Sequence, residues 1–195
     1  MGKGKLIVFY GINNLGKTTQ AKLLVERLSK EGHNAKYLKY GIYDLEPSGP
    51  ILNGYLRNGN PYKLTAREFQ IIQSLNRTQY ESKLKEDLEQ GTNVVAEDYW
   101  GTGVAWGIGA GVDKNFLLEI NKHLLREDLA FLFIGDRFSS GVEKNHRHEG
   151  DEELTKRVAR FHAELANEFG WIWINASQTI DRVSDDIWAQ IKKIL

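Results

Sequence analysis

The chain has 195 residues, with 26 lysines and arginines against 26 aspartates and glutamates, so its net charge is zero and offers no overall field for nucleic acid or membrane. The absence of cysteine excludes disulfides and thiolate metal sites and suits a reducing cytoplasm. The longest apolar stretches, 6–10 and 129–134, are far shorter than the ~20 residues of a membrane-spanning helix.

Short apolar runs alternate with segments of helical periodicity along the chain. The predicted strands are 5–10, 35–40, 93–97, 129–134 and 171–175, and the predicted helices are 17–31, 65–90, 113–126, 151–169 and 180–193. Strands that are apolar along most of their length and separated by helices indicate a parallel sheet covered on both faces. We therefore expect a single α/β domain, residues 1–195, built as a three-layer α/β/α sandwich with a five-stranded parallel sheet.

The first predicted strand leads directly into G-I-N-N-L-G-K-T, residues 11–18, which matches the phosphate-binding P-loop pattern. Its glycines allow a tight turn whose N–H groups point inward, toward the positive end of the following helix. Lys17 would reach the β- and γ-phosphates of ATP, and Thr18 would ligate Mg²⁺. The predicted phosphate-binding residues are Gly11, Asn13, Asn14, Leu15, Gly16, Lys17, Thr18 and Thr19. The alternative is a structural glycine turn beside a surface lysine.

Two segments interrupt the alternation of strands and helices. Residues 41–61 hold all three prolines, and residues 135–150 form a polar stretch with arginines and histidines. We expect both to cover the substrate, the second as a lid at about 136–150. Arg137 and Arg147 in this lid are candidate catalytic residues, because a guanidinium can neutralise the charge of a phosphoryl group in transfer. Alternatively, both are solvated loop arginines.

An acidic pair, Glu97 and Asp98, ends the third predicted strand. Such a pair can hold magnesium or orient the attacking group in a P-loop enzyme, which makes Thr18, Glu97 and Asp98 the predicted metal ligands. Alternatively, the pair caps the next helix. The glycine-rich stretch that follows contains Thr102, which we place beside the acceptor.

On the long helix, Gln73 and Arg77 lie four residues apart and share one face. Arg77 is either part of the acceptor pocket or a surface partner of Glu81. Trp171, Trp173 and Trp188 are most simply interpreted as core residues.

Taken in order, these motifs resemble the thymidylate kinase family over nearly the whole chain. The correspondence includes the P-loop, the acidic strand end, T-G-V-A-W at 102–106, N-R at 76–77 and N-A-S-x-x-I at 175–180. Leu45-Glu46-Pro47 occupies the place of the family's R-E-P loop. The resemblance implies ATP and Mg²⁺ as cofactors, dTMP as acceptor and a homodimer. It also implies that Asn13 meets the acceptor's sugar and that Glu46 lies in the substrate site.

Three acceptor-side positions depart from the family pattern. Leu45 stands in place of the arginine of R-E-P, Asp98 in place of the arginine of D-R-Y, and Gln73 in place of the aromatic residue that stacks on thymine. The cations available to hold an acceptor phosphate are Lys39, Arg57 and Arg77, which the sequence does not rank.

The leading hypothesis is an ATP- and Mg²⁺-dependent nucleoside monophosphate kinase that converts dTMP to dTDP, with Lys17, Arg137, Arg147 and Glu97 as catalytic residues. One alternative is a deoxynucleoside kinase in which Glu97 is the base, since a hydroxyl acceptor needs one and the arginines for an acceptor phosphate are missing. The other is a non-catalytic ATP-binding protein that has kept the donor half of the site.

Overall fold

The computed structural model describes residues 2–138 and 151–195. Five parallel strands form one sheet in the order β2-β3-β1-β4-β5. The strands are β1 (Leu6–Tyr10), β2 (Ala35–Lys39), β3 (Asn93–Glu97), β4 (Leu129–Ile134) and β5 (Ile172–Asn175). All residues of β1 and β3 are buried, and β1 is a continuous apolar run, as expected for a central strand of a covered parallel sheet. The predicted five-stranded parallel sheet is confirmed.

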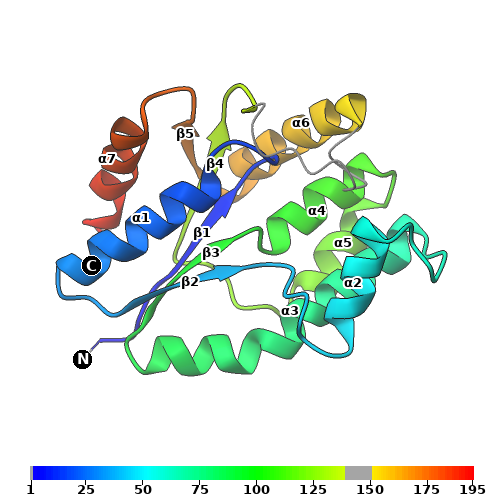
Figure 1. Cartoon of the computed structure of the whole chain (residues 1–195), viewed down its shortest axis with the longest axis horizontal. Coiled ribbons are helices and arrows are strands. Elements are labelled where there is room, and N and C mark those ends of the chain that lie inside the picture. The colour runs from blue at the N-terminus through cyan, green and yellow to red at the C-terminus, as the bar shows by residue number, and fades with distance from the viewer. Residues whose placement is uncertain (1, 139–150) are drawn as a thin grey trace.

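Helices cover both faces of the sheet (Figure 1). α1 (Lys17–Lys30) and α7 (Ile180–Ile191) pack together on one face. The other face carries α3 (Ala66–Glu89), α4 (Trp100–Gly109) and α6 (Glu152–Phe169), and α5 (Lys114–Asn121) packs on α3 and α4. A capping box starts α3, with Thr65 and Glu68 bonded to each other's backbone N–H groups. This arrangement leaves the carboxyl ends of the strands open for a ligand.

The proline-bearing segment 41–61 contains a helix that the sequence reading missed. α2 spans Ser48–Arg57 and packs on α3. Its proline, Pro50, lies in the first turn, where the missing N–H has no intrahelical acceptor to lose. A proline in the first turn is therefore compatible with a helix.

The glycine-rich stretch after the acidic pair is also helical, as α4, although glycine disfavours helix interiors. Tertiary packing explains the glycines. A Cβ at Gly101 would lie 2.4 Å from the Trp171 ring, and one at Gly107 would lie 2.7 Å from Leu117. The close approach of neighbouring side chains therefore outweighs the low helix propensity.

The interpretation of the three C-terminal tryptophans as core residues is wrong for one of them. Trp171 and Trp188 are buried, whereas Trp173 is 44% exposed. Trp173 lies on β5, which is an edge strand, and successive strand residues point to opposite faces. One face of this edge strand is left partly uncovered. Aromatic character alone therefore did not predict whether the ring of Trp173 is buried.

No helix within residues 2–138 and 151–195 combines the length and the apolar character needed to cross a membrane.

A buried histidine on α6 predicts acid sensitivity. His162 is 1% exposed, and its Nδ1 is hydrogen-bonded to the Val158 carbonyl oxygen at 3.0 Å. Burial lowers the pKa of His162 from 6.5 to about 3. Below pH 6.5 the unfolded chain therefore binds a proton that the folded chain does not, so stability falls as the pH falls toward 3.

Urea unfolding at pH 7 and pH 5 tests this expectation. The wild-type protein should lose about 2 kcal/mol more between these pH values than His162→Leu does. His162→Gln keeps an amide donor for Val158 but does not titrate, and it should behave like the leucine variant. Equal pH dependence in all three proteins would contradict the expectation.

Candidate active site

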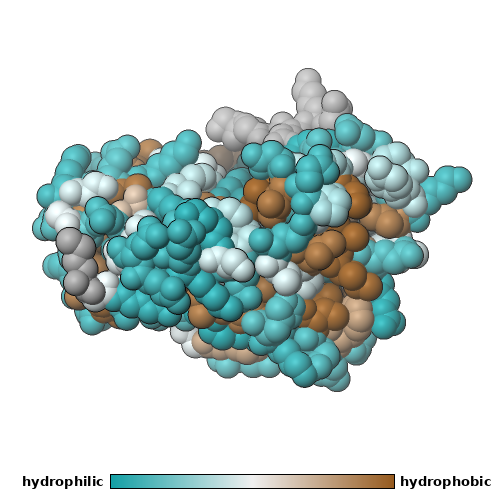
Figure 2. Space-filling view, turned by 90° about the horizontal axis from the view of Figure 1, so that it is seen from below, coloured by the Kyte–Doolittle hydropathy of each residue, from teal (hydrophilic) through white to brown (hydrophobic). Residues whose placement is uncertain are grey.

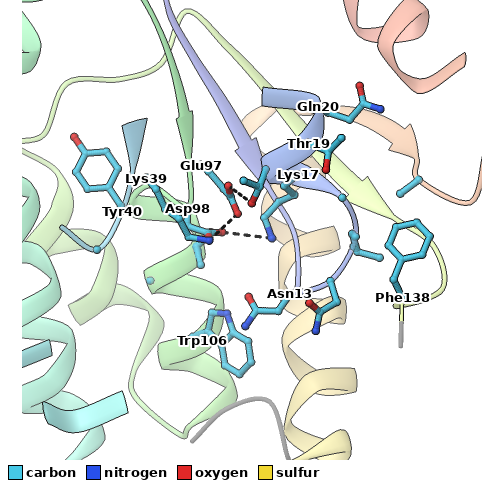
Figure 3. A pocket seen from close by; sticks show the side chains of 18 of the residues that line it. Asn13, Lys17, Thr19, Gln20, Lys39, Tyr40, Glu97, Asp98, Trp106 and Phe138 are labelled. Atoms are coloured by element: carbon cyan, nitrogen blue, oxygen red, sulfur yellow. Dashed lines mark hydrogen bonds and ion pairs between the residues drawn. The ribbon is translucent and has the colours of Figure 1, made fainter. Parts of the chain in front are cut away.

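A cavity of about 790 Å³ opens at the carboxyl ends of β1, β2 and β3 (Figure 3). The P-loop forms one wall, and α2, α3 and α4 contribute to the opposite wall. Most of the predicted site residues line this cavity: Asn13, Asn14, Leu15, Gly16, Lys17, Thr18, Thr19, Gln73, Arg77, Glu97, Asp98 and Thr102. The fold thus brings donor-side and acceptor-side candidates into one space.

The P-loop has the backbone that its glycines predict. Gly11 and Gly16 have φ values of 131° and 79°, and a Cβ at Gly11 would lie 2.7 Å from the Phe133 carbonyl oxygen. Lys17 begins α1, is 3% exposed, and donates to the carbonyls of Gly11 and Ile12 at 3.0 and 2.7 Å. Its ammonium is thereby held over the loop that would enclose a phosphate, and phosphate oxygens can replace these carbonyls as acceptors.

The acidic pair contacts the P-loop helix directly. Thr18 Oγ1 donates to Glu97 Oε2 at 2.7 Å, and Lys39 Nζ donates to Glu97 Oε1 at 3.1 Å. Lys17 Nζ lies 3.6 Å from Asp98 Oδ1. Asp98 takes a left-handed φ of 63° immediately after the strand, which is uncommon for a residue other than glycine. In Figure 3 these side chains converge on the mouth of the P-loop.

The two carboxylates have opposite electrostatic tendencies. Burial would raise the pKa of Glu97, but the ammonium groups of Lys17 and Lys39, with hydrogen bonds from Tyr37 and Thr18, outweigh burial and lower it. For Asp98, burial prevails over the attraction of Lys17, and the adjacent Glu97 charge adds to it, so its pKa is raised. Glu97 is therefore the carboxylate that stays ionised.

The capping interpretation of this acidic pair does not hold. The N-cap of α4 is Tyr99, and no side chain caps that helix end. Asp98 instead accepts from the Thr102 hydroxyl at 3.2 Å.

On the opposite wall, Arg77 is 2% exposed. It donates to Asn121 Oδ1 at 3.2 Å and to Gln73 Oε1 at 3.0 Å. Burial lowers the pKa of Arg77 to about 10, and a Cβ at Gly103 would lie 2.6 Å from its guanidinium. The surface pairing with Glu81 is therefore wrong, because Arg77 turns inward while Glu81 binds the Leu125 N–H and Lys85.

Comparison with known proteins agrees with this architecture. The family model described as "Thymidylate kinase" matches residues 9–187. The chain belongs to the thymidylate kinase family. The thymidylate kinase of Homo sapiens is 30% identical, with 95% of this chain and 88% of that protein covered. The thymidylate kinase of Plasmodium falciparum is 29% identical over 98% of this chain and 91% of its own length.

A solved structure of thymidylate kinase from Candida albicans superposes with a TM-score of 0.83 at 24% identity, covering 98% of this chain and 92% of that one. At this identity the likeness speaks for the fold. Together with the family match, it confirms the predicted P-loop fold and makes the chain a nucleoside monophosphate kinase, as the sequence predicts.

The three positions that depart from the thymidylate kinase pattern lie in different surroundings. The Asp98 carboxylate lies beside the Lys17 ammonium, and the Gln73 amide oxygen accepts a hydrogen bond from Arg77. Leu45 is half-buried and does not line the cavity. The three altered positions therefore belong to different contacts and were not replaced by a single new cluster.

Several predicted site residues do not line the cavity. Glu46 is exposed, and its carbonyl accepts from Gln79 at 2.7 Å, because the turn before α2 directs it toward α3. The structure therefore does not bring Glu46 into this cavity. Arg137 is half-buried, with an Nε that has no hydrogen-bond partner among the described residues. Arg147 and most of the expected lid, 139–150, lie outside the described residues.

The structure adds residues that the sequence reading did not assign to the site. Tyr37 donates its hydroxyl to Glu97 Oε2 at 2.7 Å. Phe138 and Ile180 are 48% and 58% exposed and line the cavity near the P-loop, where the Phe138 N–H donates to the Asn14 carbonyl at 2.8 Å. Tyr37 stands two residues before Lys39 on β2 and therefore shares its face, which is a signal that the strand pattern contains.

Proposed function

We propose that this kinase transfers the γ-phosphoryl group of ATP to the phosphate of dTMP, producing ADP and dTDP, with Mg²⁺ as cofactor and one catalytic domain, residues 1–195. The observation that carries the proposal is the continuity of the cavity, which runs from Lys17 of the P-loop to Arg77 and Gln73 on the far wall. A donor triphosphate and an acceptor nucleotide can therefore meet inside one continuous cavity, as the family relationship leads us to expect.

The transfer breaks the bond between the γ-phosphorus and the β,γ-bridging oxygen and forms a bond from that phosphorus to an acceptor phosphate oxygen. The acceptor oxygen is already anionic, so no proton has to be removed and no base is needed. The protein contributes position and positive charge, the main sources of catalysis in phosphoryl transfer. Lys17 supplies charge on the donor side, and the lid residues Arg137 and Arg147 would supply it over the transferring group.

The donor set beside the P-loop fits Mg²⁺, which prefers oxygen ligands. Thr18 and Glu97 would hold the ion, directly or through its waters, with Asp98 beside them; the bound ion would neutralise charge on the phosphates. Among the described residues no group of three or more His, Cys, Asp or Glu side chains could hold a metal on its own. Phosphate oxygens and water would therefore complete the coordination.

The geometry does not favour the two alternatives. A deoxynucleoside kinase would need Glu97 to take a proton from a hydroxyl, but Glu97 accepts from Thr18, Tyr37 and Lys39, and its pKa is lowered. A non-catalytic binding protein is not favoured either, because the chain belongs to a family of kinases and keeps Thr18 on Glu97 and Lys17 beside Asp98.

The test is chromatographic detection of ADP and acceptor product after incubation with ATP and Mg²⁺. dTMP, other monophosphates and thymidine are supplied in separate reactions. Selective conversion of dTMP to dTDP supports the proposal. Conversion of thymidine with dTMP left unchanged would favour the nucleoside kinase, and ATP binding without product would favour the binding protein.

We further propose that the enzyme is a cytoplasmic homodimer. Ile71 and Leu75, one turn apart on α3, are 46% and 39% exposed. Figure 2 views the side of the molecule on which α3 lies in Figure 1 and shows hydrophobic side chains gathered there. An exposed apolar cluster of this kind supports a protein–protein contact.

Light scattering after size-exclusion chromatography measures the oligomeric state. Ile71→Glu should convert a dimer into a monomer, because it would bury a carboxylate without a partner at the interface. Ser82→Glu, at an exposed position farther along α3, is the control and should remain dimeric. A monomeric wild-type protein would overturn the dimer.

A further inference from the structure

The cation that holds the acceptor's phosphate is not evident from the sequence, because two arginines expected there are Leu45 and Asp98. From the contacts around the cavity we infer that Lys39 is this cation. The inference rests on the proposed function and assigns one of its residues.

Lys39 lies close to the P-loop. Acceptor oxygen and γ-phosphorus must approach to roughly 3–3.5 Å before transfer, so the cation for the acceptor phosphate has to lie close to Lys17 and Thr18. A single carboxylate, that of Glu97, separates Lys39 from Thr18. Lys39 Nζ donates to Glu97 Oε1 at 3.1 Å, and Thr18 Oγ1 donates to Glu97 Oε2 at 2.7 Å.

Strand register fixes this position. Lys39 is the last residue of β2 and pairs with Glu97, the last residue of β3. The following N–H, that of Tyr40, donates to the Glu97 carbonyl at 2.9 Å and keeps the two strand ends together. In Figure 3 the Lys39 side chain lies beside Asp98 on the side of the cavity facing the P-loop.

Lys39 is charged and able to move. Its side chain is 48% exposed, in contrast to 4% for Glu97, so the ammonium can turn into the cavity while the carboxylate stays fixed. A phosphate carries more negative charge than the single carboxylate oxygen that Lys39 now binds, and would compete for it.

The two other cations that line the acceptor side are committed elsewhere. Arg77 is buried, and both of its terminal nitrogens have amide partners, on Asn121 and Gln73. Arg57 ends α2, with its guanidinium 4.6 Å from the Tyr43 ring centroid and its NH1 3.4 Å from Asn53 Oδ1. These contacts place Arg57 on the α2 wall of the cavity and Arg77 on its α3 wall.

Calorimetric binding of dTMP and of thymidine, which differ by the phosphate, isolates this contact. Wild type should bind dTMP more tightly than thymidine. Lys39→Met should weaken dTMP binding about 10- to 100-fold and leave thymidine binding unchanged. Lys39→Arg should restore the preference for dTMP, because it keeps the positive charge.

Two matched variants complete the experiment. Lys36→Met removes a lysine from the same strand that pairs with Asp87, outside the cavity lining, and should bind dTMP as wild type does. Arg57→Met tests the competing cation and should retain most of the phosphate preference. Loss of that preference in Arg57→Met with its retention in Lys39→Met would overturn the inference.

Turnover is measured on the same proteins. Lys39→Met should raise the KM for dTMP by a similar factor and leave the KM for ATP nearly unchanged. If wild type converts no monophosphate, the proposed function fails, and the inference with it. If wild type converts dTMP and Lys39→Met binds and converts it equally well, only the role of Lys39 is overturned.

Discussion

Replacing Lys17 by methionine should lower kcat by about 10²- to 10³-fold or more, while the protein remains folded. Lys17 is the P-loop ammonium, held by the carbonyls of Gly11 and Ile12 at the point where the donor's β- and γ-phosphates would lie. Negative charge on the transferring group is stabilised there by a preorganised cation that is itself buried. Methionine keeps the length of the side chain and removes the charge.

The fold should survive because the polar contacts of Lys17 lie within the site, on the carbonyls of Gly11 and Ile12 and the carboxylate of Asp98. Its ion pair with Asp98 is long, at 3.6 Å, and the pKa of Asp98 is raised, so this carboxyl can take up a proton when the ammonium is removed. Methionine, nearly matched in volume, should also avoid a cavity. Thermal unfolding is therefore expected to change by only a few degrees.

Steady-state turnover of dTMP and the unfolding temperature are measured on Lys17→Met and on Lys22→Met. Lys22 is exposed on the same helix and lies 5.9 Å from the Tyr37 ring centroid, so its replacement controls for losing a lysine from α1. Lys22→Met should turn over as wild type does. Normal turnover in Lys17→Met would overturn the assignment of Lys17 to the donor phosphates.

The donor half of the site is easier to predict from the sequence than the acceptor half, for a physical reason. The donor half is local: residues 11–18 form a loop whose glycines, lysine and threonine act through neighbouring backbone, so their spacing alone carries the structure. The acceptor half is assembled from β2, β3, α2, α3 and α4. The Lys39–Glu97 contact depends on strand register, and the burial of Arg77 depends on Gly103 and Asn121, which are distant in sequence.

The contrast between local patterns and contacts of distant residues also explains which elements of the fold were predictable. β1 and β4 were the easiest strands to predict, because each is a continuous apolar run between helices, as buried parallel strands require. α4 was not predictable, because its glycines read as a loop until Trp171 and Leu117 are seen to pack against them. Local propensity was overridden there by contacts that a single sequence does not reveal.

The second large effect is expected for Glu97→Gln, which should lower kcat by about 10²-fold and weaken the apparent affinity for Mg²⁺ by about 10- to 100-fold. The variant keeps the shape of the side chain and removes its negative charge. Burial would raise the pKa of Glu97, but Lys17, Lys39, Tyr37 and Thr18 lower it, so the native carboxylate is ionised. Glutamine can still accept from Thr18 but cannot neutralise a metal ion.

The pH dependence distinguishes a metal-holding role from a basic one. Since the folded pKa of Glu97 lies below its ordinary value of 4.5, Glu97 is ionised at every pH above that value. Wild-type turnover of dTMP should therefore show no acidic limb from Glu97 between pH 6 and 8. A general base, in contrast, is tuned to titrate near the working pH.

Turnover is measured against Mg²⁺ concentration for wild type, Glu97→Gln, Glu97→Asp and Glu86→Gln. The aspartate variant retains the charge and restores the residue that the family pattern has at this position, so it should keep much of the activity. Glu86 is exposed on α3 and pairs with Lys83, and its glutamine variant should match wild type. An unchanged Mg²⁺ requirement in Glu97→Gln would show that this carboxylate does not hold the ion. Because its partners Thr18 and Lys39 face the donor and acceptor sides, loss of Glu97 should weaken both halves of the site together.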